Sequence, residues 1–236
     1  MTTTTQRRQA FEHKREIRRQ FSAREVAEAV GPIVKGIECF GVSIGAWSLI
    51  DLITWCLQAT GPADCTISTW TVANHDLNAA WKLLTTRAIK KIRFLVDLSF
   101  PSRQPSYCAA LREAFGDDCI RLSANHAKFT LLRNAEWDLV IRGTANLNQN
   151  SRWEWWELSD SKPMADFLEQ LVANIFDTQP AQGQFDKRPI EHIQDFQALA
   201  GTPTSELRGD VRAYFSNEPF GNDVRRAGLS YLGKVK

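Results

Sequence analysis

Apolar positions in the first half of the chain switch between the spacing of buried strands and the spacing of helices. Short runs rich in apolar and β-branched residues predict strands at residues 37–42, 65–72, 91–98 and 119–122. Apolar residues three and four apart predict helices between them, at 47–58, 76–86 and 105–115, with Asp76 capping the second. This alternation predicts an α/β fold.

The pattern changes in the second half of the chain, where strands follow one another directly. Residues 128–132 and 138–142 predict two strands joined by the turn 133–137, which is a hairpin signal. A further strand is expected at 153–158 and a long amphipathic helix at 162–176. Alternation followed by a cluster of strands predicts a mixed β-sheet with helices on both faces.

The two ends of the chain differ from this central part, which we place at residues 31–178. Residues 1–30 form a basic segment, with a helix expected at 6–19 and a short one from the capping-box pattern at Ser22 and Glu25 through Val30. The basic helix is interpreted as a solvated surface or as a contact for a phosphate backbone. Residues 179–236 show weak periodicity, which predicts a partly extended or disordered extension with one helix at 190–199.

Composition narrows the class of protein but names no partner. The 236 residues are 43% hydrophobic with a net charge of +2, enough for a core and too balanced to indicate an acidic or basic partner. Five scattered cysteines without C-x-x-C spacing predict reduced, buried thiols. The polar first twenty residues and the short apolar window at 44–57, interrupted by Asp51, predict a cytoplasmic protein without stable membrane association.

The candidate chemistry lies in the hairpin region. His126 and Lys128 are two residues apart, so they project to the same side if both begin the strand. The returning strand would bring Gly143, Thr144 and Asn146 to the same end of the sheet. One imidazole, one ammonium, one hydroxyl and one amide are therefore expected to converge.

These groups suit a phosphate. A neutral imidazole can attack phosphorus and form a phosphohistidine, while Lys128, Asn146 and Thr144 donate to the non-bridging oxygens. The sequence offers no tight carboxylate pair and no His/Cys cluster with metal-ligand spacing. We therefore expect a mechanism without a metal or another cofactor.

The pattern H-x-K followed by G-[ST]-x-N resembles the signature of the phospholipase D-like superfamily. His126, Lys128, Gly143, Thr144 and Asn146 match it position by position, and the expected strand order agrees over about residues 36–176. The resemblance implies an α/β/α sandwich and a phosphodiester substrate. It also implies that Glu154, or alternatively Glu157, holds the histidine.

The resemblance further implies a homodimer. This chemistry uses one histidine as nucleophile and a second, on the opposite side, as acid, and the chain has only one H-x-K motif. Single-motif relatives pair two subunits about a two-fold axis. Arg142 and Arg152 flank the motif, and we interpret them as contacts for neighbouring phosphates or as members of surface ion pairs.

Two departures keep alternative functions open. The family motif usually continues to an aspartate where this chain has Arg133, and the loop to Gly143 is longer than usual. The first hypothesis is a nuclease acting on DNA, the second a catalytically weakened DNA-binding or assembly module, and the third a phospholipid hydrolase or transferase. The tryptophans at 153, 155 and 156 are interpreted as core or dimer contacts, with base stacking as the alternative.

Overall fold

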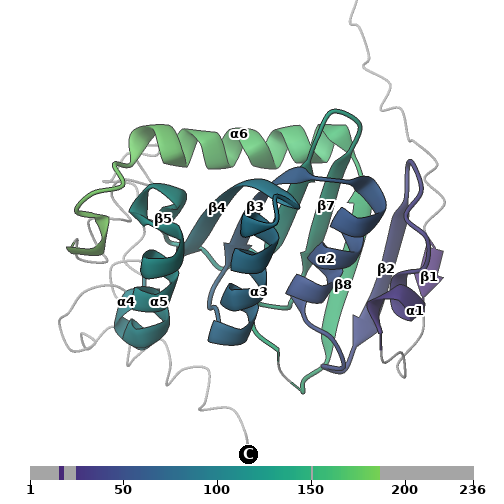
Figure 1. Cartoon of the computed structure of the whole chain (residues 1–236), viewed down its shortest axis with the longest axis horizontal. Coiled ribbons are helices and arrows are strands. Elements are labelled where there is room, and N and C mark those ends of the chain that lie inside the picture. The colour runs from purple at the N-terminus through teal and green to yellow at the C-terminus, as the bar shows by residue number, and fades with distance from the viewer. Residues whose placement is uncertain (1–15, 19–24, 150, 187–236) are drawn as a thin grey trace, which may run out of the picture.

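The computed structural model describes residues 16–18, 25–149 and 151–186, and these form one mixed sheet with helices on both faces (Figure 1). The sheet has eight strands in the order β1-β2-β8-β7-β6-β3-β4-β5. The strands are β1 Glu16–Arg18, β2 Glu38–Ser43, β3 Ala63–Thr69, β4 Ile89–Asp97, β5 Ile120–Ser123, β6 Phe129–Arg133, β7 Asp138–Gly143 and β8 Glu154–Asp160. The predicted fold class is confirmed.

The helices divide between the two faces of the sheet. They are α1 Val26–Val30, α2 Leu49–Thr60, α3 Asn74–Thr85, α4 Phe100–Arg103, α5 Pro105–Phe115 and α6 Lys162–Thr178, with 3-10 turns at Asp117–Cys119 and Gln184–Asp186. Helices α2, α3 and α5 stand in front of the sheet in Figure 1, and α6 crosses behind it. The chain order places the crossover helices on one face, and the helix that follows β8 on the other.

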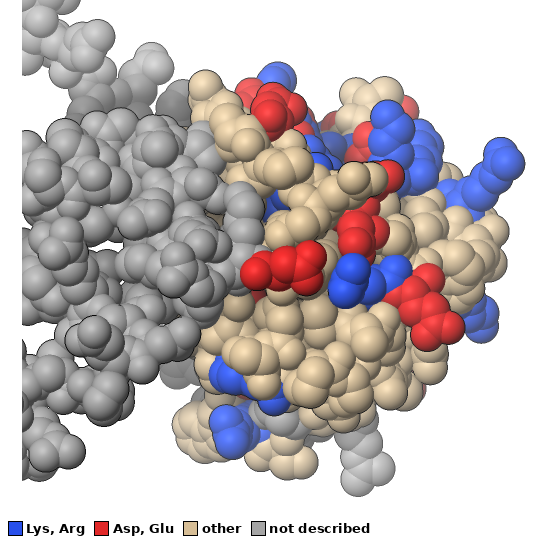
Figure 2. Space-filling model, turned by 90° about the vertical axis from the view of Figure 1, so that its left-hand side faces the viewer, with Lys and Arg blue, Asp and Glu red and all other residues tan. Residues whose placement is uncertain are grey.

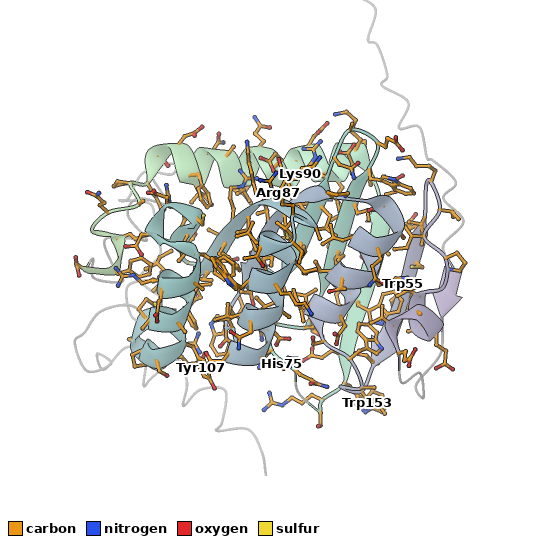
Figure 3. The ribbon with its side chains drawn as sticks, viewed as in Figure 1. Trp55, His75, Arg87, Lys90, Tyr107 and Trp153 are labelled. Atoms are coloured by element: carbon orange, nitrogen blue, oxygen red, sulfur yellow. The ribbon has the colours of Figure 1, made fainter. Side chains whose placement is uncertain are left out.

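Strand direction gathers many loops at one edge of the sheet, which we call the site edge. Strands β3, β4 and β5 run parallel, while β6, β7, β8 and β2 alternate in direction. Thus β2, β3, β4, β5 and β7 end where β6 and β8 begin. Helices α2 and α3 start at the same edge, as the position of His75 in Figure 3 shows. The opposite edge carries Arg87 and Lys90 (Figure 3).

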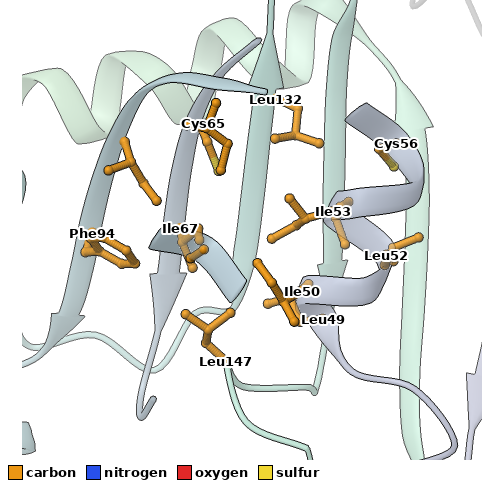
Figure 4. Packing of buried hydrophobic residues seen from close by; sticks show 14 of the residues in the cluster. Leu49, Ile50, Leu52, Ile53, Cys56, Cys65, Ile67, Phe94, Leu132 and Leu147 are labelled. Atoms are coloured by element: carbon orange, nitrogen blue, oxygen red, sulfur yellow. The ribbon is translucent and has the colours of Figure 1, made fainter. Parts of the chain in front are cut away.

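Packing differs on the two faces. The larger core lies under α2, α3 and α5, where Ile50 and Ile53 of α2 pack near Ile67 of β3 and Leu132 of β6 (Figure 4). The smaller core lies under α6 and joins side chains from β6 and β7, namely Phe129, Leu131 and Val140, to Ala165 and Val172. Burying a side chain of this size contributes about 1.5–3 kcal/mol, so both helical layers are held mainly by apolar contact.

Several predicted elements need correction. A helix is expected at residues 6–19, but the described part, Glu16–Arg18, is a strand that pairs in parallel with β2. Its short length and backbone pairing override the local helical preference. The rest of that expected helix, Ser22, and the helix expected at 190–199 lie outside the described residues. The sequence does not predict helix α4, because its four residues, Phe100–Arg103, are too few to show helical periodicity.

Asp76 does not cap α3 as expected; the N-terminal cap is Ala73. Asp76 lies inside the first turn and is fully buried against the start of α2, where its Oδ1 accepts a hydrogen bond from Ser48 Oγ at 3.0 Å. Burial raises the pKa of this carboxyl group, and hydrogen bonds from Ser48 and His75 oppose the rise. Asp76 therefore links the starts of α2 and α3 and does not act as the N-terminal cap of α3.

The cysteine prediction is confirmed for all five residues as free thiols. Four are buried and Cys119 is partly exposed. Burial raises the pKa of the Cys56 and Cys65 thiols, which keeps them protonated and poorly reactive. The thiols therefore serve as small apolar core groups.

On the end of the molecule seen in Figure 2, blue and red side chains intermix over the described residues. Within the described ranges, no helix is both long and apolar enough to cross a membrane.

Candidate functional site

His126 and Lys128 lie in a loop at the site edge and not in a strand, because β6 begins only at Phe129. The expected argument from strand alternation therefore does not apply to them. His126 is exposed and Lys128 is half-buried. What fixes the loop is a set of hydrogen bonds to the ends of the neighbouring strands.

Asn125 is the centre of that set. It is 8% exposed, and its Nδ2 donates to Ser68 Oγ at 2.8 Å and to the Leu95 carbonyl at 3.3 Å. Its Oδ1 accepts from the Ala127 backbone N–H at 2.9 Å, and its own N–H donates to Asp97 Oδ2 at 3.3 Å. The peptide around His126 is thus tied to the ends of β3 and β4. Ser68 Oγ completes the network by donating to the Ala127 carbonyl at 2.8 Å.

Asn146 is fixed by the segment that follows β3. Its Oδ1 accepts from the Trp70 backbone N–H at 3.1 Å and from Thr69 Oγ1 at 3.4 Å. The next residue, Leu147, forms a parallel bridge with Val72. Because the oxygen end of the amide is held by donors, the Nδ2 end is the donor that Asn146 can present to a ligand.

Trp70 connects Asn146 to His126. Its ring meets the imidazole edge to face, with centroids 5.7 Å apart, while its backbone N–H holds Asn146. The Arg103 guanidinium carbon lies 3.6 Å from the centroid of the same tryptophan ring, and Nη2 donates to the Trp70 carbonyl at 2.9 Å. Burial lowers the pKa of Arg103, and the Asp97 charge opposes this. Trp70 therefore positions the imidazole, and its contact with Arg103 brings a second cation near His126.

Lys128 connects the histidine to the glutamate. Its Nζ donates to the His126 carbonyl at 3.1 Å. Burial lowers the pKa of this ammonium group, and the charges of Glu154 and Asp97 raise it. The two carboxylates therefore help to keep a partly desolvated Lys128 charged.

Glu154 in turn bonds to Thr144. The Thr144 hydroxyl donates to Glu154 Oε2 and accepts from the Trp155 backbone N–H at 3.1 Å. The Thr144 N–H donates to the Trp155 carbonyl at 3.0 Å. The role of Thr144 in substrate binding stays a prediction; in the structure its hydroxyl joins the end of β7 to the start of β8.

Gly143 has a steric role in the same strand pair. A Cβ atom built on it would lie 2.3 Å from the Trp155 carbonyl oxygen and 3.1 Å from the Trp156 Cα. Any side chain here would push the two strands apart. The predicted approach of a ligand to this glycine stays a prediction; in the structure the glycine allows the close approach of β8.

The remaining candidate residues are Arg142, Glu157 and Arg152. Arg142 pairs with Phe129, the residue after Lys128, and lines the same pocket as Lys128. It forms an ion pair with Glu157 across β7 and β8. Arg152 is exposed at the site edge, in the segment before β8.

Arg133, which replaces the usual aspartate, lies at the far end of β6 from the loop. Its Nε donates to Asp138 Oδ1 at 2.7 Å, and its Nη2 donates to Asp166 Oδ1 at 2.6 Å. It thus ties the hairpin to α6. This difference from the phospholipase D-like pattern that the sequence resembles does not touch the loop that holds His126.

The sequence alone does not single out Asn125, Trp70 or Arg103, and it cannot place Ser68, which ends an early strand. Asn125 stands directly before His126 in the sequence. Ser68, Thr69 and Trp70 lie at and just after the end of β3, beside the start of β6. Their role depends on β3 lying beside β6, a pairing that no local pattern encodes. The described residues contain no group of three or more His, Cys, Asp or Glu side chains arranged to hold a metal ion.

Comparison with known proteins gives similarity only to solved structures. No protein-family model and no curated protein matches the sequence. The chain is similar to NucT from Helicobacter pylori at 13% identity and a TM-score of 0.42, over 60% of this chain and 97% of that one. It is also similar to polyphosphate kinase from Porphyromonas gingivalis at 12% identity and a TM-score of 0.43, over 72% of this chain and 27% of that one.

Proposed function

We propose that the chain is a phospholipase D-like phosphodiesterase that cleaves DNA through His126. One observation carries the proposal: a continuous series of contacts and charge interactions links all four candidate catalytic residues at one edge of the sheet. Asn146 accepts a hydrogen bond from the Trp70 backbone, and the Trp70 ring contacts the His126 imidazole. Lys128 donates to the His126 carbonyl, and the charge of Glu154 acts on Lys128. An imidazole, an ammonium group and an amide N–H₂ at one solvent-facing edge are the groups that a phosphodiester requires.

The proposed reaction proceeds in two displacements. A lone pair of the His126 imidazole forms a bond to phosphorus, and the bond from phosphorus to the leaving oxygen breaks. Lys128 and the Asn146 amide stabilise the charge on the non-bridging oxygens. Water then attacks phosphorus and gives a proton to the group that protonated the leaving oxygen, the phosphorus–nitrogen bond breaks, and the free imidazole and a phosphomonoester are released.

The leaving oxygen needs a proton from the side opposite to the nucleophile. We propose that His126 of a second subunit supplies it, in a dimer whose two-fold axis passes through the site. The exposed position of His126 at the edge of the domain is compatible with this pairing. A strictly monomeric protein that cleaves DNA would contradict this part of the proposal.

The starts of α2 and α3 add to the support for an anionic substrate. Both helices have twelve residues and begin at the site edge. The positive ends of their dipoles therefore point toward the side on which a phosphate would bind.

The proposal is tested by incubating single-stranded and duplex DNA with the protein in the presence of a chelator. We expect cleavage to persist with the chelator and to fall at least about a thousandfold in His126→Ala, which removes the nucleophile. His75→Ala is the matched control, because His75 is an exposed histidine at the same edge, and we expect it to cleave normally. Cleavage that survives in His126→Ala would contradict the proposal.

A further inference from the structure

We infer that a pocket beside Lys128 binds the edge of an unpaired nucleobase next to the phosphate, an inference that rests on the proposed nuclease function. The pocket lies between the start of α2 and the site-edge ends of β7 and β8. Trp47, Leu52, Ile141 and Trp156 give it apolar walls, and Lys128 and Asn148 also line it.

Two polar atoms in these walls lack partners. Trp156 is 4% exposed, yet its indole Nε1–H meets no acceptor among the described residues. The buried Oδ1 of Asn148 likewise meets no described donor. A buried N–H and a buried C=O without partners each destabilise the fold, and a ligand edge that supplies one acceptor and one donor would satisfy both.

The shape of the pocket favours a flat ring. Trp47 and Trp156 meet edge to face with centroids 5.8 Å apart. The enclosed cavity volume is only about 30 Å³, so a flat ring could enter by no more than its edge and a bulky group could not enter. A nucleobase is flat, stacks on aromatic side chains and carries donors and acceptors on its edge.

A lipid chain would fit these walls less well. It would cover the apolar surface but leave the Trp156 N–H and the Asn148 oxygen without partners. Lys128 belongs to both the pocket and the catalytic loop, so a base in the pocket would be joined to a phosphate near His126. A base paired in a duplex could not enter, so the pocket favours single-stranded or locally opened DNA.

The test compares a thymidine hexamer with a hexamer of abasic deoxyribose phosphates that has the same charge. Binding is measured by fluorescence anisotropy in the His126→Ala background, which prevents turnover. We expect the abasic hexamer to bind roughly tenfold or more weakly, because base stacking is lost. Trp156→Phe keeps an aromatic wall but removes the N–H, and should weaken the thymidine hexamer about threefold to tenfold without affecting the abasic one.

Matched variants distinguish this pocket from the exposed tryptophans as the place where a base binds. Asn148→Ala should repeat the Trp156→Phe pattern, and it tests the pocket even if Trp156→Phe fails to fold. Trp81→Phe alters an exposed tryptophan on α3 and should change neither affinity. Base-dependent binding lost in Trp153→Ala but kept in Trp156→Phe would assign the base to the exposed Trp153 and overturn the inference.

The inference and the proposed function can fail separately. Equal binding of both hexamers, or no binding of either, would overturn the pocket even if the wild-type protein cleaves DNA. Hydrolysis of short-chain phospholipid that depends on Leu52 but is unaffected by Trp156→Phe would assign the pocket to lipid. Base-dependent binding without any cleavage would support the pocket and reject the catalytic proposal.

Discussion

At the scale of single residues, Lys128 shows how the site balances burial against charge. Burial removes water from the ammonium group and lowers its pKa, while Glu154 and Asp97 supply negative charge that opposes the loss. The unfolded chain would hold this proton up to a higher pH than the folded chain. Between those two pKa values stability therefore rises with pH, while the positive charge that would bind phosphate in the proposed site is lost.

Glu154→Gln should move the alkaline loss of phosphate binding to lower pH. The substitution removes a charge that raises the pKa of Lys128, so the ammonium group deprotonates earlier. The affinity for inorganic phosphate, measured by calorimetry from neutral to alkaline pH, checks this. Glu113→Gln, which removes an exposed carboxylate on α5, is the control and should leave the profile unchanged. A shift toward higher pH in Glu154→Gln would contradict this account of Lys128.

At the scale of elements, the loop that carries His126 depends on strands that are distant in sequence. Asn125 bonds to Ser68 at the end of β3 and to Leu95 in β4. It touches no substrate in the proposed reaction and acts as a positioning residue for His126.

Asn125→Ala should lower both stability and turnover. It leaves buried partners unpaired, so we expect a loss of about 1–3 kcal/mol in the free energy of unfolding, measured in urea. Because the His126 peptide loses its anchor, kcat per folded molecule should fall at least about tenfold with little change in KM. Asn125→Asp, which keeps the acceptor for the Ala127 N–H, should recover part of kcat. A stability loss with unchanged kcat would show a purely structural role.

For Arg133, which lies in the β6–β7 hairpin away from His126, we predict a loss of stability without a loss of cleavage per folded molecule. Arg133→Ala removes hydrogen bonds to Asp138 and Asp166 and should cost about 1–3 kcal/mol of stability. Arg133→Asp introduces the aspartate of the phospholipase D-like motif but places three carboxylates together, so it should be less stable still. Urea unfolding and cleavage per folded molecule check both variants. Higher activity in Arg133→Asp would contradict a role confined to the far end of β6.

The elements that the sequence predicts well are those set by local pattern. Helix α5 has the predicted bounds 105–115, and β7 and α6 differ from prediction by one or two residues. Patterns fail where neighbours decide the outcome. Residues 16–18 pair with β2 in place of a helix, and His126 follows the hydrogen bonds of Asn125 and not strand alternation.

At the scale of the whole molecule, topology brings the motif together. His126 and Asn146 are separated by β6 and β7, and both contact the Trp70 segment that follows β3. The H-x-K and G-T-x-N segments can be matched from the sequence, but their shared support cannot. It requires the antiparallel pairing of β3 with β6, which joins the two halves of the sheet.

The most direct test of the account is to look for a covalent phosphoryl group on His126 during turnover. The wild-type protein is mixed with DNA in the presence of a chelator, quenched at alkaline pH to preserve phosphohistidine, digested and analysed by mass spectrometry. We predict a nucleotidyl adduct on the peptide that contains His126, absent in His126→Ala and retained in His75→Ala. Efficient cleavage of DNA with no adduct on that peptide at any quench time, or an adduct on another residue, would contradict the account.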